Sequence, residues 1–193
     1  MGGGDKSLRA LNGRPMIAYA IETLRPQVDA LILNANGDPQ RFAAFGLPVV
    51  PDRDADFAGP LAGLLAGMAW TREHAPGARH VATAACDTPF FPSDIVARLR
   101  SAAEAAGADI ATASSAGQGH FVFGLWSLAL QEDLAAYLAE GRRKVQDWIE
   151  RHAFVTVDFA PVTVGGAAVD PFFNINTPED LEAAEALLAK GQQ

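Results

Sequence analysis

The sequence predicts a single α/β domain built on a mostly parallel sheet with helices on both faces. Short apolar runs typical of buried strands alternate with helical patterns along the whole chain. Polar residues end several of these runs, as expected where a parallel sheet presents its carboxyl ends to a ligand. No repeat and no linker-like segment interrupts the 193 residues, so we expect one domain over 1–193.

The apolar periodicity places most of the elements. A helix is expected at 16–24, where apolar side chains recur on one helical face. A short continuous apolar run at 30–33 predicts a buried parallel strand. Further helices are expected at 60–72, 92–105, 127–138 and 142–152, and further strands at 48–50, 80–85, 109–113, 121–126 and 153–159.

The C-terminal part of the chain carries the clearest helix start. Thr177 can act as the N-cap, Pro178 suits the first helical position and Asp180 completes a capping box. Before this helix, the segment 163–169 contains two consecutive glycines, and we expect it to be a flexible loop.

Charge and composition exclude several classes of function. The formal net charge is −8 and the sequence pI is about 4.9, which argues against binding to nucleic acid or to an anionic membrane. No apolar run reaches the roughly 18–20 residues that cross a bilayer, and the glycine-rich start lacks the apolar region of a signal peptide. Cys86 is the only cysteine, so no internal disulfide can form. We therefore expect a cytoplasmic protein.

Three polar residues that end predicted strands are the first candidates for a site. Asn34 offers both a donor and an acceptor to the edge of a base or sugar. Asp52 can bind a ribose or a base, or help to hold a metal ion. Asp87 can hold Mg2+, which prefers one or two carboxylates together with waters and substrate phosphates. Taken alone, each of the three is more often a turn residue or a helix cap.

Glycine-rich segments supply two further candidates. Lys6 follows three glycines at 2–4 and Asp5. This segment is typical of the end of a phosphate-binding loop, in which the lysine neutralises phosphate oxygens as a point charge. The segment 59–63 begins a helix whose free N–H groups can face a substrate. A disordered start and a plain helix start are the structural alternatives.

Two polar segments in the second half of the chain complete the set. Asn174 and Asn176 flank Ile175, and this alternation predicts two amides on one face with the isoleucine in the core. The basic stretch after Gly141 concentrates positive charge on an acidic protein and can grip an anionic substrate, or it can be a solvated helix start. The four histidines show no metal-binding spacing, and Cys86 reads as a small buried residue.

In their order along the chain, these segments closely resemble the molybdenum cofactor guanylyltransferases. The similarity covers nearly the whole chain, and the joint order of the motifs is far more specific than any one of them. The matching segments are the glycine-rich end at Lys6, Asn34-Ala35-Asn36, Val50-Pro51-Asp52, Gly59-Pro60-Leu61-Ala62-Gly63, Cys86-Asp87-Thr88-Pro89, Gly141-Arg142-Arg143-Lys144-Val145 and Asn174-Ile175-Asn176-Thr177-Pro178-Glu179-Asp180-Leu181.

The resemblance implies a three-layer, Rossmann-like nucleotidyltransferase that transfers GMP from GTP to molybdenum-molybdopterin, giving the guanine dinucleotide cofactor and pyrophosphate. It implies Mg2+ held by Asp87, catalytic roles for Asp87 and Lys6, and GTP contacts at Lys6, Asn34, Asp52 and Asp87. We expect a monomer, with molybdoenzymes or their chaperones as candidate partners. The residues that the resemblance places towards the pterin are Arg142, Arg143, Lys144, Asn174 and Asn176.

The same resemblance places one strand and a Leu-Ala-Gly-Gly-x-Ser-x-Arg segment before Met1. We therefore expect the first strand of the sheet and most of the phosphate loop to be missing from this chain, and the natural protein to be longer. Because that strand would be central, its neighbours are expected to have unpaired edges.

Two other functions are compatible with the sequence. The first is another nucleotidyltransferase of the same fold, which uses CTP or forms a nucleotide sugar. The second is a non-catalytic protein that binds or delivers the pterin, because the phosphate loop is truncated.

Overall fold

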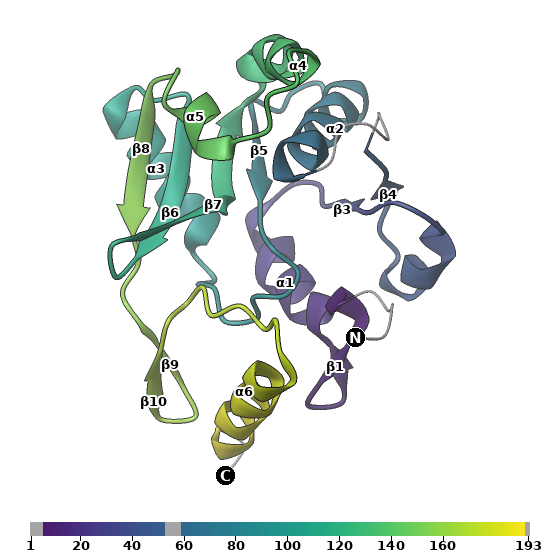
Figure 1. Cartoon of the computed structure of the whole chain (residues 1–193), viewed down its shortest axis with the longest axis vertical. Coiled ribbons are helices and arrows are strands. Elements are labelled where there is room, and N and C mark those ends of the chain that lie inside the picture. The colour runs from purple at the N-terminus through teal and green to yellow at the C-terminus, as the bar shows by residue number, and fades with distance from the viewer. Residues whose placement is uncertain (1–5, 53–58, 192–193) are drawn as a thin grey trace.

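The computed structural model describes residues 6–52 and 59–191 (Figure 1). The glycines and the aspartate predicted to end a phosphate loop, at 2–5, lie outside the described residues, whereas Lys6 begins a short 3-10 helix, η1 (Lys6–Leu8). Within the described ranges, no helix is long and apolar enough to cross a membrane.

The central sheet has four strands in the order β5-β7-β6-β8. β6 and β8 pair in parallel, whereas β7 lies between β5 and β6 and is antiparallel to both. β5, β6 and β8 therefore run in one direction, as the predicted mostly parallel sheet requires, and β7 runs against them. The strands are β5 (His80–Thr83), β6 (Ile110–Ser115), β7 (Gln118–Ser127) and β8 (Phe154–Asp158).

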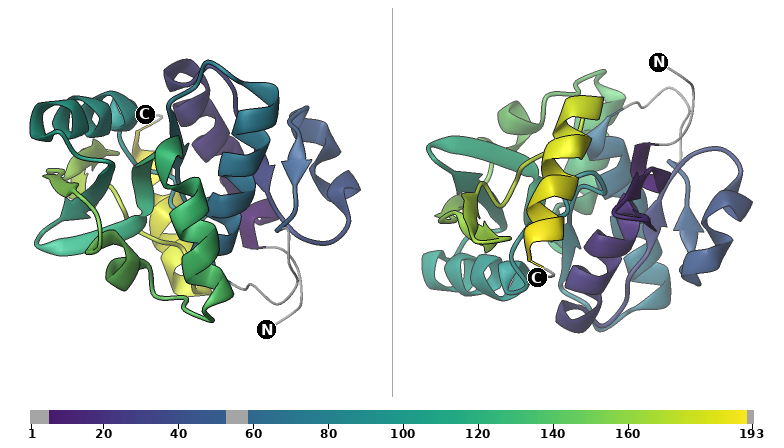
Figure 2. Two further views of the ribbon diagram at one scale, coloured as in Figure 1. Left: turned by 90° about the horizontal axis from the view of Figure 1, so that it is seen from above. Right: turned by 90° about the horizontal axis from the view of Figure 1, so that it is seen from below.

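Helices cover both faces of this sheet and give three layers (Figures 1 and 2). Successive residues of a strand point to opposite faces: Ala111 and Leu125 pack with α3, whereas their neighbours Ile110 and Trp126 pack with α2 and α4. The helices on the first face are α1 (Met16–Leu24) and α3 (Ile95–Ala106). Those on the second are α2 (Pro60–His74), α4 (Gln131–Ala139) and α5 (Val145–Ile149).

Smaller elements surround these layers. β3 (Leu33–Asn34) and β4 (Val49–Val50) form a separate parallel pair, and β1 (Ala10–Leu11) pairs with β2 (Arg14–Pro15). The C-terminal helix α6 (Pro178–Lys190) packs with this N-terminal part of the chain around Leu11 and Met16. Three 3-10 helices, η2 (Arg25–Gln27), η3 (Pro39–Phe45) and η4 (Leu128–Leu130), fill connections.

A cavity of about 220 Å³ separates β3 from β5, and within the described residues these two strands belong to different sheets. We call this cavity the interstrand slot. Side chains from the two strand segments and from the helices on either side line it, including Leu33, Val81, Ile21 and Leu64. The slot is therefore an apolar space bounded by two strand edges and two helices.

The two helices with the clearest sequence signals form as predicted. α1 spans Met16–Leu24. At the start of α6, the Thr177 hydroxyl accepts from the Asp180 amide at 3.1 Å, and the Asp180 carboxylate accepts from the Thr177 amide at 2.9 Å. This is the reciprocal capping box, which satisfies two of the free N–H groups at a helix start.

The prediction of a flexible loop at 163–169 is wrong, because this segment is a β-hairpin. β9 (Val162–Val164) and β10 (Ala167–Val169) pair across Gly165 and Gly166. Both glycines have positive φ, +55° and +77°, as a two-residue hairpin turn of type I′ requires. A Cβ on Gly165 would also lie 2.0 Å from the Leu187 carbonyl oxygen of α6, so only glycine fits there.

The helix predicted at 142–152 is also shorter in the structure. α5 covers only Val145–Ile149, because Gly141 has φ +78° and Lys144 has an extended backbone, with φ −81° and ψ 116°. The basic stretch therefore lies on a connection and not on a helix.

We expect Gly67→Ala to stabilise the chain. Gly67 lies within α2, and an added Cβ would make ordinary contacts of 3.9 Å with Ile32 and Val81 beside the slot. Replacing a glycine in a helix interior by alanine removes backbone entropy from the unfolded chain and gains about 0.5–1 kcal/mol. Urea denaturation of the variant and the wild type measures the difference, and an unchanged or lower midpoint would contradict this packing.

Candidate functional site

The carboxyl ends of β3 and β4 bring together a polar cluster. The Asn34 side-chain amide donates to the Asp52 carboxylate at 3.0 Å and to the Val50 carbonyl at 3.0 Å. The Asn36 amide donates to the other oxygen of Asp52 at 2.8 Å, and its own oxygen accepts from the Asp52 backbone N–H at 2.8 Å. The two predicted nucleotide contacts, Asn34 and Asp52, are therefore in direct contact and held in fixed orientations.

The start of α2 closes tightly over this cluster. Gly59 is the N-cap residue, with φ +118°, and Pro60 occupies the first turn. A Cβ added to Gly63 would lie 2.2 Å from Oδ1 of Asn34. Glycine at this position therefore lets the first turn of α2 approach the amide that contacts Asp52, beside the free N–H groups of the helix start.

A second cluster lies beyond the end of β5. The Lys6 ammonium donates to Oδ1 of Asn176 at 3.3 Å. The Ile175 backbone N–H donates to the Asp87 carbonyl oxygen at 2.9 Å. Ile175 is 1% exposed while Asn174 and Asn176 are exposed, which confirms the predicted alternation. Lys6, Asp87 and Asn176, which are far apart in the sequence, thus meet at one place.

The Asp87 carboxyl is half-buried, and this changes its acidity. Burial raises the pKa of Asp87 above its ordinary value, while a backbone hydrogen bond and the positive charge of Lys6 partly oppose the rise. A carboxylate that is partly removed from water gains more from a nearby cation than an exposed one does. This carboxylate is therefore a good partner for a positive charge, from Lys6 or from a metal ion.

Packing connects the two clusters. Cys86 precedes Asp87 and packs in the same apolar cluster as Leu33 and Ala35, which flank Asn34. Cys86 and Asn34 also line the interstrand slot. The four predicted GTP contacts are accordingly arranged along one edge of the molecule, at the carboxyl ends of β3, β4 and β5.

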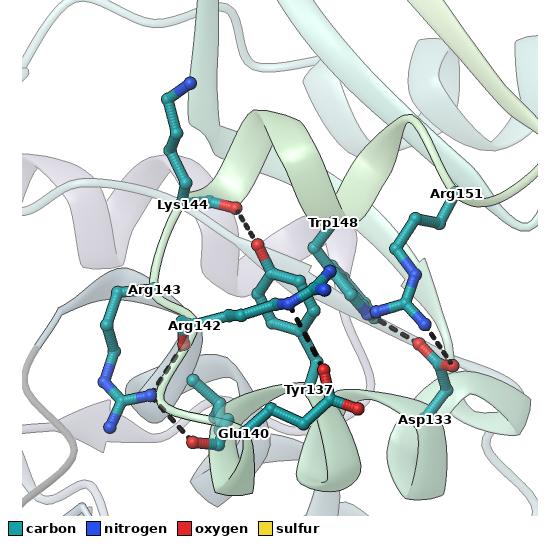
Figure 3. A network of polar contacts seen from close by, with 9 residues as sticks. Asp133, Tyr137, Glu140, Arg142, Arg143, Lys144, Trp148 and Arg151 are labelled. Atoms are coloured by element: carbon teal, nitrogen blue, oxygen red, sulfur yellow. Dashed lines mark hydrogen bonds and ion pairs between the residues drawn. The ribbon is translucent and has the colours of Figure 1, made fainter.

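The basic stretch lies elsewhere (Figure 3). The Arg142 side chain pairs with Glu140 at 3.2 Å, and Arg143 donates to the Leu138 carbonyl at 2.7 Å. Lys144 pairs with Asp147 at 3.0 Å. Figures 1 and 2 show α4 and α5, which flank this stretch, at the end of the sheet opposite to α6. The prediction that these residues and Asn174 and Asn176 both face the pterin therefore requires two separate contact regions.

The network in Figure 3 connects the basic stretch to α4 and α4 to α5. The Tyr137 hydroxyl donates to the Lys144 carbonyl at 2.9 Å, and Asp133 accepts from the Trp148 indole at 2.8 Å. Burial raises the pKa of Asp133, but the Trp148 hydrogen bond and the charges of His152 and Arg151 outweigh it, and the pKa lies below its ordinary value.

The sequence did not indicate one polar cluster at the end of β6. Ser115 lies between His120 and Asp170, with hydrogen-bond distances of 2.7 Å to the histidine ring and 2.9 Å to the carboxylate. The histidines showed no motif spacing, and Asp170 precedes a proline like many turn residues. Only the pairing of β6 with β7, which returns His120 towards Ser115, brings this group together.

Comparison with known proteins places the chain in a family. The model of the MobA-like NTP transferase domain matches residues 1–156. The chain is 50% identical over 190 residues to the molybdenum cofactor guanylyltransferase of Bradyrhizobium sp. (strain ORS 278), covering 98% of this chain and 87% of that protein. It is 48% identical to the protein of the same name from Rhizobium meliloti (strain 1021), covering 96% and 85%.

The chain belongs to the molybdenum cofactor guanylyltransferase family. It is therefore a nucleotidyltransferase, and the family resemblance read from its motifs is confirmed.

Solved structures agree with the guanylyltransferase fold. Molybdopterin-guanine dinucleotide biosynthesis protein A from Archaeoglobus fulgidus superposes with a TM-score of 0.73 at 21% identity, covering 97% of this chain and 92% of that one. A CMP:2-keto-3-deoxy-manno-octonic acid synthetase in complex with CTP also gives 0.73, at 15% identity, covering 96% and 92%. At these identities the likeness establishes the shared fold.

We expect Gly63→Ala to weaken nucleotide binding by this guanylyltransferase. The new Cβ would displace the Asn34 amide and break its hydrogen bond to Asp52. Losing one such bond costs about 1 kcal/mol, so we expect roughly a fivefold weaker Kd for GTP by calorimetry. Gly67→Ala, one turn further along α2, is the matched control and should bind GTP like the wild type.

We expect Asp87→Asn to stabilise the fold in a pH-dependent way. Folding raises the pKa of Asp87, so the folded chain holds this proton more tightly than the unfolded chain does. The carboxyl then lowers the free energy of unfolding as the pH rises from the ordinary value of 3.8 through the raised pKa. The asparagine variant should therefore gain more stability at neutral pH than near pH 4, as measured by urea denaturation. The same difference at both pH values would contradict the burial of this carboxyl.

Proposed function

We propose that the chain transfers GMP from GTP to the phosphate of molybdenum-molybdopterin, releasing pyrophosphate. The observation that carries this proposal is the near full-length similarity, at about half identity, to proteins named molybdenum cofactor guanylyltransferase. The arrangement of the two polar clusters along one edge supports it, because the reaction must hold two anionic substrates side by side.

The first cluster is suited to the nucleoside. Asn34 and Asp52 are fixed by their mutual hydrogen bond, and amide and carboxylate groups can read the polar edge of a base or the hydroxyls of a ribose. Because both side chains are already oriented, little rotamer entropy is lost when the ligand binds.

The second cluster is suited to the phosphates. Lys6 brings a positive charge next to Asn176 and close enough to Asp87 to affect the pKa of that carboxyl. In the proposed reaction, a phosphate oxygen of the pterin substrate attacks the α-phosphorus of GTP. The bond from that phosphorus to the bridging oxygen breaks, and pyrophosphate leaves with the electron pair. Lys6 stabilises the negative charge that develops on the phosphates.

The residues of the second cluster also fit a divalent cation, which we take to be Mg2+. Within residues 6–52 and 59–191, no group of three acidic, histidine or cysteine side chains forms a closed metal cage. Asp87 offers a carboxylate, which suits an ion that completes its shell with waters and substrate phosphates. When bound, the ion would supply further positive charge to the phosphates. A protein of similar fold from Mycobacterium tuberculosis has been solved in complex with manganese, at 16% identity and a TM-score of 0.67.

The exposed amides of Asn174 and Asn176 are the proposed contacts to the pterin. Arg142, Arg143 and Lys144 are the proposed contacts to a distant part of the same pterin substrate. We propose that the chain acts as a monomer in the cytoplasm and passes its product to molybdoenzymes or their chaperones.

The first test is a calorimetric titration of the chain with GTP and with CTP, each with Mg2+, followed by pyrophosphate release in the presence of molybdenum-molybdopterin. Selective GTP binding with pyrophosphate release supports the guanylyltransferase. Preferential CTP binding indicates another nucleotidyltransferase. Binding of the pterin with no pyrophosphate release indicates a delivery protein.

We expect Asp87→Ala to reduce turnover by at least about 100-fold while the fold stays intact, because the variant loses the proposed metal ligand. Pyrophosphate release measures turnover, and circular dichroism checks the fold. Activity close to that of the wild type would exclude this role for Asp87.

A further inference from the structure

One segment runs across the carboxyl edge of the central sheet from β6 to β5. It begins at Asp170, which contacts Ser115, the last residue of β6. It continues to Ile175, whose N–H donates to the carbonyl of Asp87, beyond the end of β5. We call the segment 170–176 the strap. Since β5 and β6 run in the same direction, both of its attachment points are at the same edge of the sheet.

Ser115 is the centre of the attachment at β6. Its hydroxyl is buried, with the residue 3% exposed, and it lies 2.9 and 3.0 Å from the two oxygens of Asp170. Because the carboxylate can only accept, the single hydroxyl proton goes to Asp170. The serine oxygen then accepts from Nε2 of His120 at 2.7 Å. Burial lowers the pKa of His120, and the negative charge of Asp170 opposes this effect only in part.

Asp170 in turn sets the direction of the strap. Its carboxylate accepts from the Phe172 backbone N–H at 2.8 Å, which closes a tight turn. Phe172 is 5% exposed, and its ring packs against those of His120 and Phe123, with centroid distances of 4.4 and 4.8 Å. The turn and the buried ring therefore direct the backbone towards Asp87. The residues that lie beside Asp87 are Asn174, Ile175 and Asn176.

We propose that Ser115 and Asp170 are positioning residues that hold the strap so that Asn174 and Asn176 face the second substrate beside Asp87 and Lys6. This inference rests on the proposed function for the identity of that substrate. The placement of the strap itself rests only on the hydrogen bonds described above. Neither residue touches the reacting atoms, so their effect passes through the backbone of the strap.

The chain offers a matched control on the same strand. Ser114 is the neighbour of Ser115 in β6, and it is 9% exposed. Its hydroxyl donates to Asp158 at 3.0 Å, towards β8 and away from the strap. Ser114→Ala therefore removes a buried serine hydroxyl from the same strand end without touching the attachment of the strap.

The test compares Ser115→Ala with Ser114→Ala in the full chain by two measurements. The first is hydrogen exchange at the Ile175 amide, followed by NMR, which requires no activity. We expect exchange about tenfold faster in Ser115→Ala, because the strap detaches more often, and no change in Ser114→Ala. The second is steady-state kinetics with GTP and molybdenum-molybdopterin. We expect roughly a tenfold higher KM for the pterin substrate in Ser115→Ala with kcat nearly unchanged, because binding contacts and not the chemical step are weakened.

The two measurements separate the inference from the proposed function. If the wild type turns over and both serine variants behave alike in exchange and in KM, the inference is overturned. If the wild type shows no turnover, the proposed function fails, and the Ile175 exchange rates alone decide whether Ser115 positions the strap. Should Ser115→Ala not fold, Asp170→Asn takes its place, because asparagine can still accept from the Phe172 amide but replaces the charge-assisted hydrogen bond from Ser115 by a weaker neutral one.

Discussion

The hydrogen bond from the Ile175 amide to the Asp87 carbonyl, at 2.9 Å, joins the two parts of the chain on which the site depends. It satisfies two backbone groups at a place where Ile175 is almost completely buried. It also fixes the strap with respect to β5, so that Asn176 reaches Lys6 and both stand beside the carboxyl of Asp87. Together with the packing of α6 against the N-terminal part of the chain, this contact places residues from three distant segments in one site.

The local positive groups of the site oppose the net negative charge of the whole chain. A net charge of −8 produces a field that repels phosphates, so binding them requires local positive charge. Lys6 supplies such a charge, and the free N–H groups at the start of α2 lie beside the first cluster. Burial of the Asp87 carboxyl makes its charged form less stable until a cation arrives. The residue proposed to bind a cation therefore lowers the stability of the fold while no cation is bound, as is common at active sites.

Local signals made parts of this structure predictable. The capping box of Thr177 and Asp180 and the apolar face of 16–24 depend on neighbouring residues only, and both helices form as expected. Asn34 and Asp52 were selected because each ends a predicted strand, and the structure shows that their side chains are in contact. The hairpin at Gly165 and Gly166 was missed because two glycines fit a flexible loop as well as a tight turn, and its apolar flanks are only three residues long.

Contacts between distant segments could not be read from the sequence. Ser115 and Asp170 come together only because β6, β7 and the strap converge, and nothing in the sequence around either residue indicates a partner. The basic stretch was assigned to a helix because charged residues there resemble a helix start, yet the positive φ of Gly141 delays α5 until Val145. Such long-range contacts depend on the pairing of the whole sheet and not on local propensity.

The interstrand slot has a consequence for how this chain behaves in a crowded solution. Within the described residues, β3 and β5 each turn one edge towards an apolar space and pair only on their other side. Residues 31–34 and 81–84 both line the slot, and a strand edge that faces an apolar space can pair with another extended chain. Unpaired strand edges beside an apolar cavity are surfaces to which chaperones bind and through which chains associate with one another. The fraction of the protein that stays unaggregated should therefore fall more steeply with protein concentration than the free energy of unfolding alone would predict.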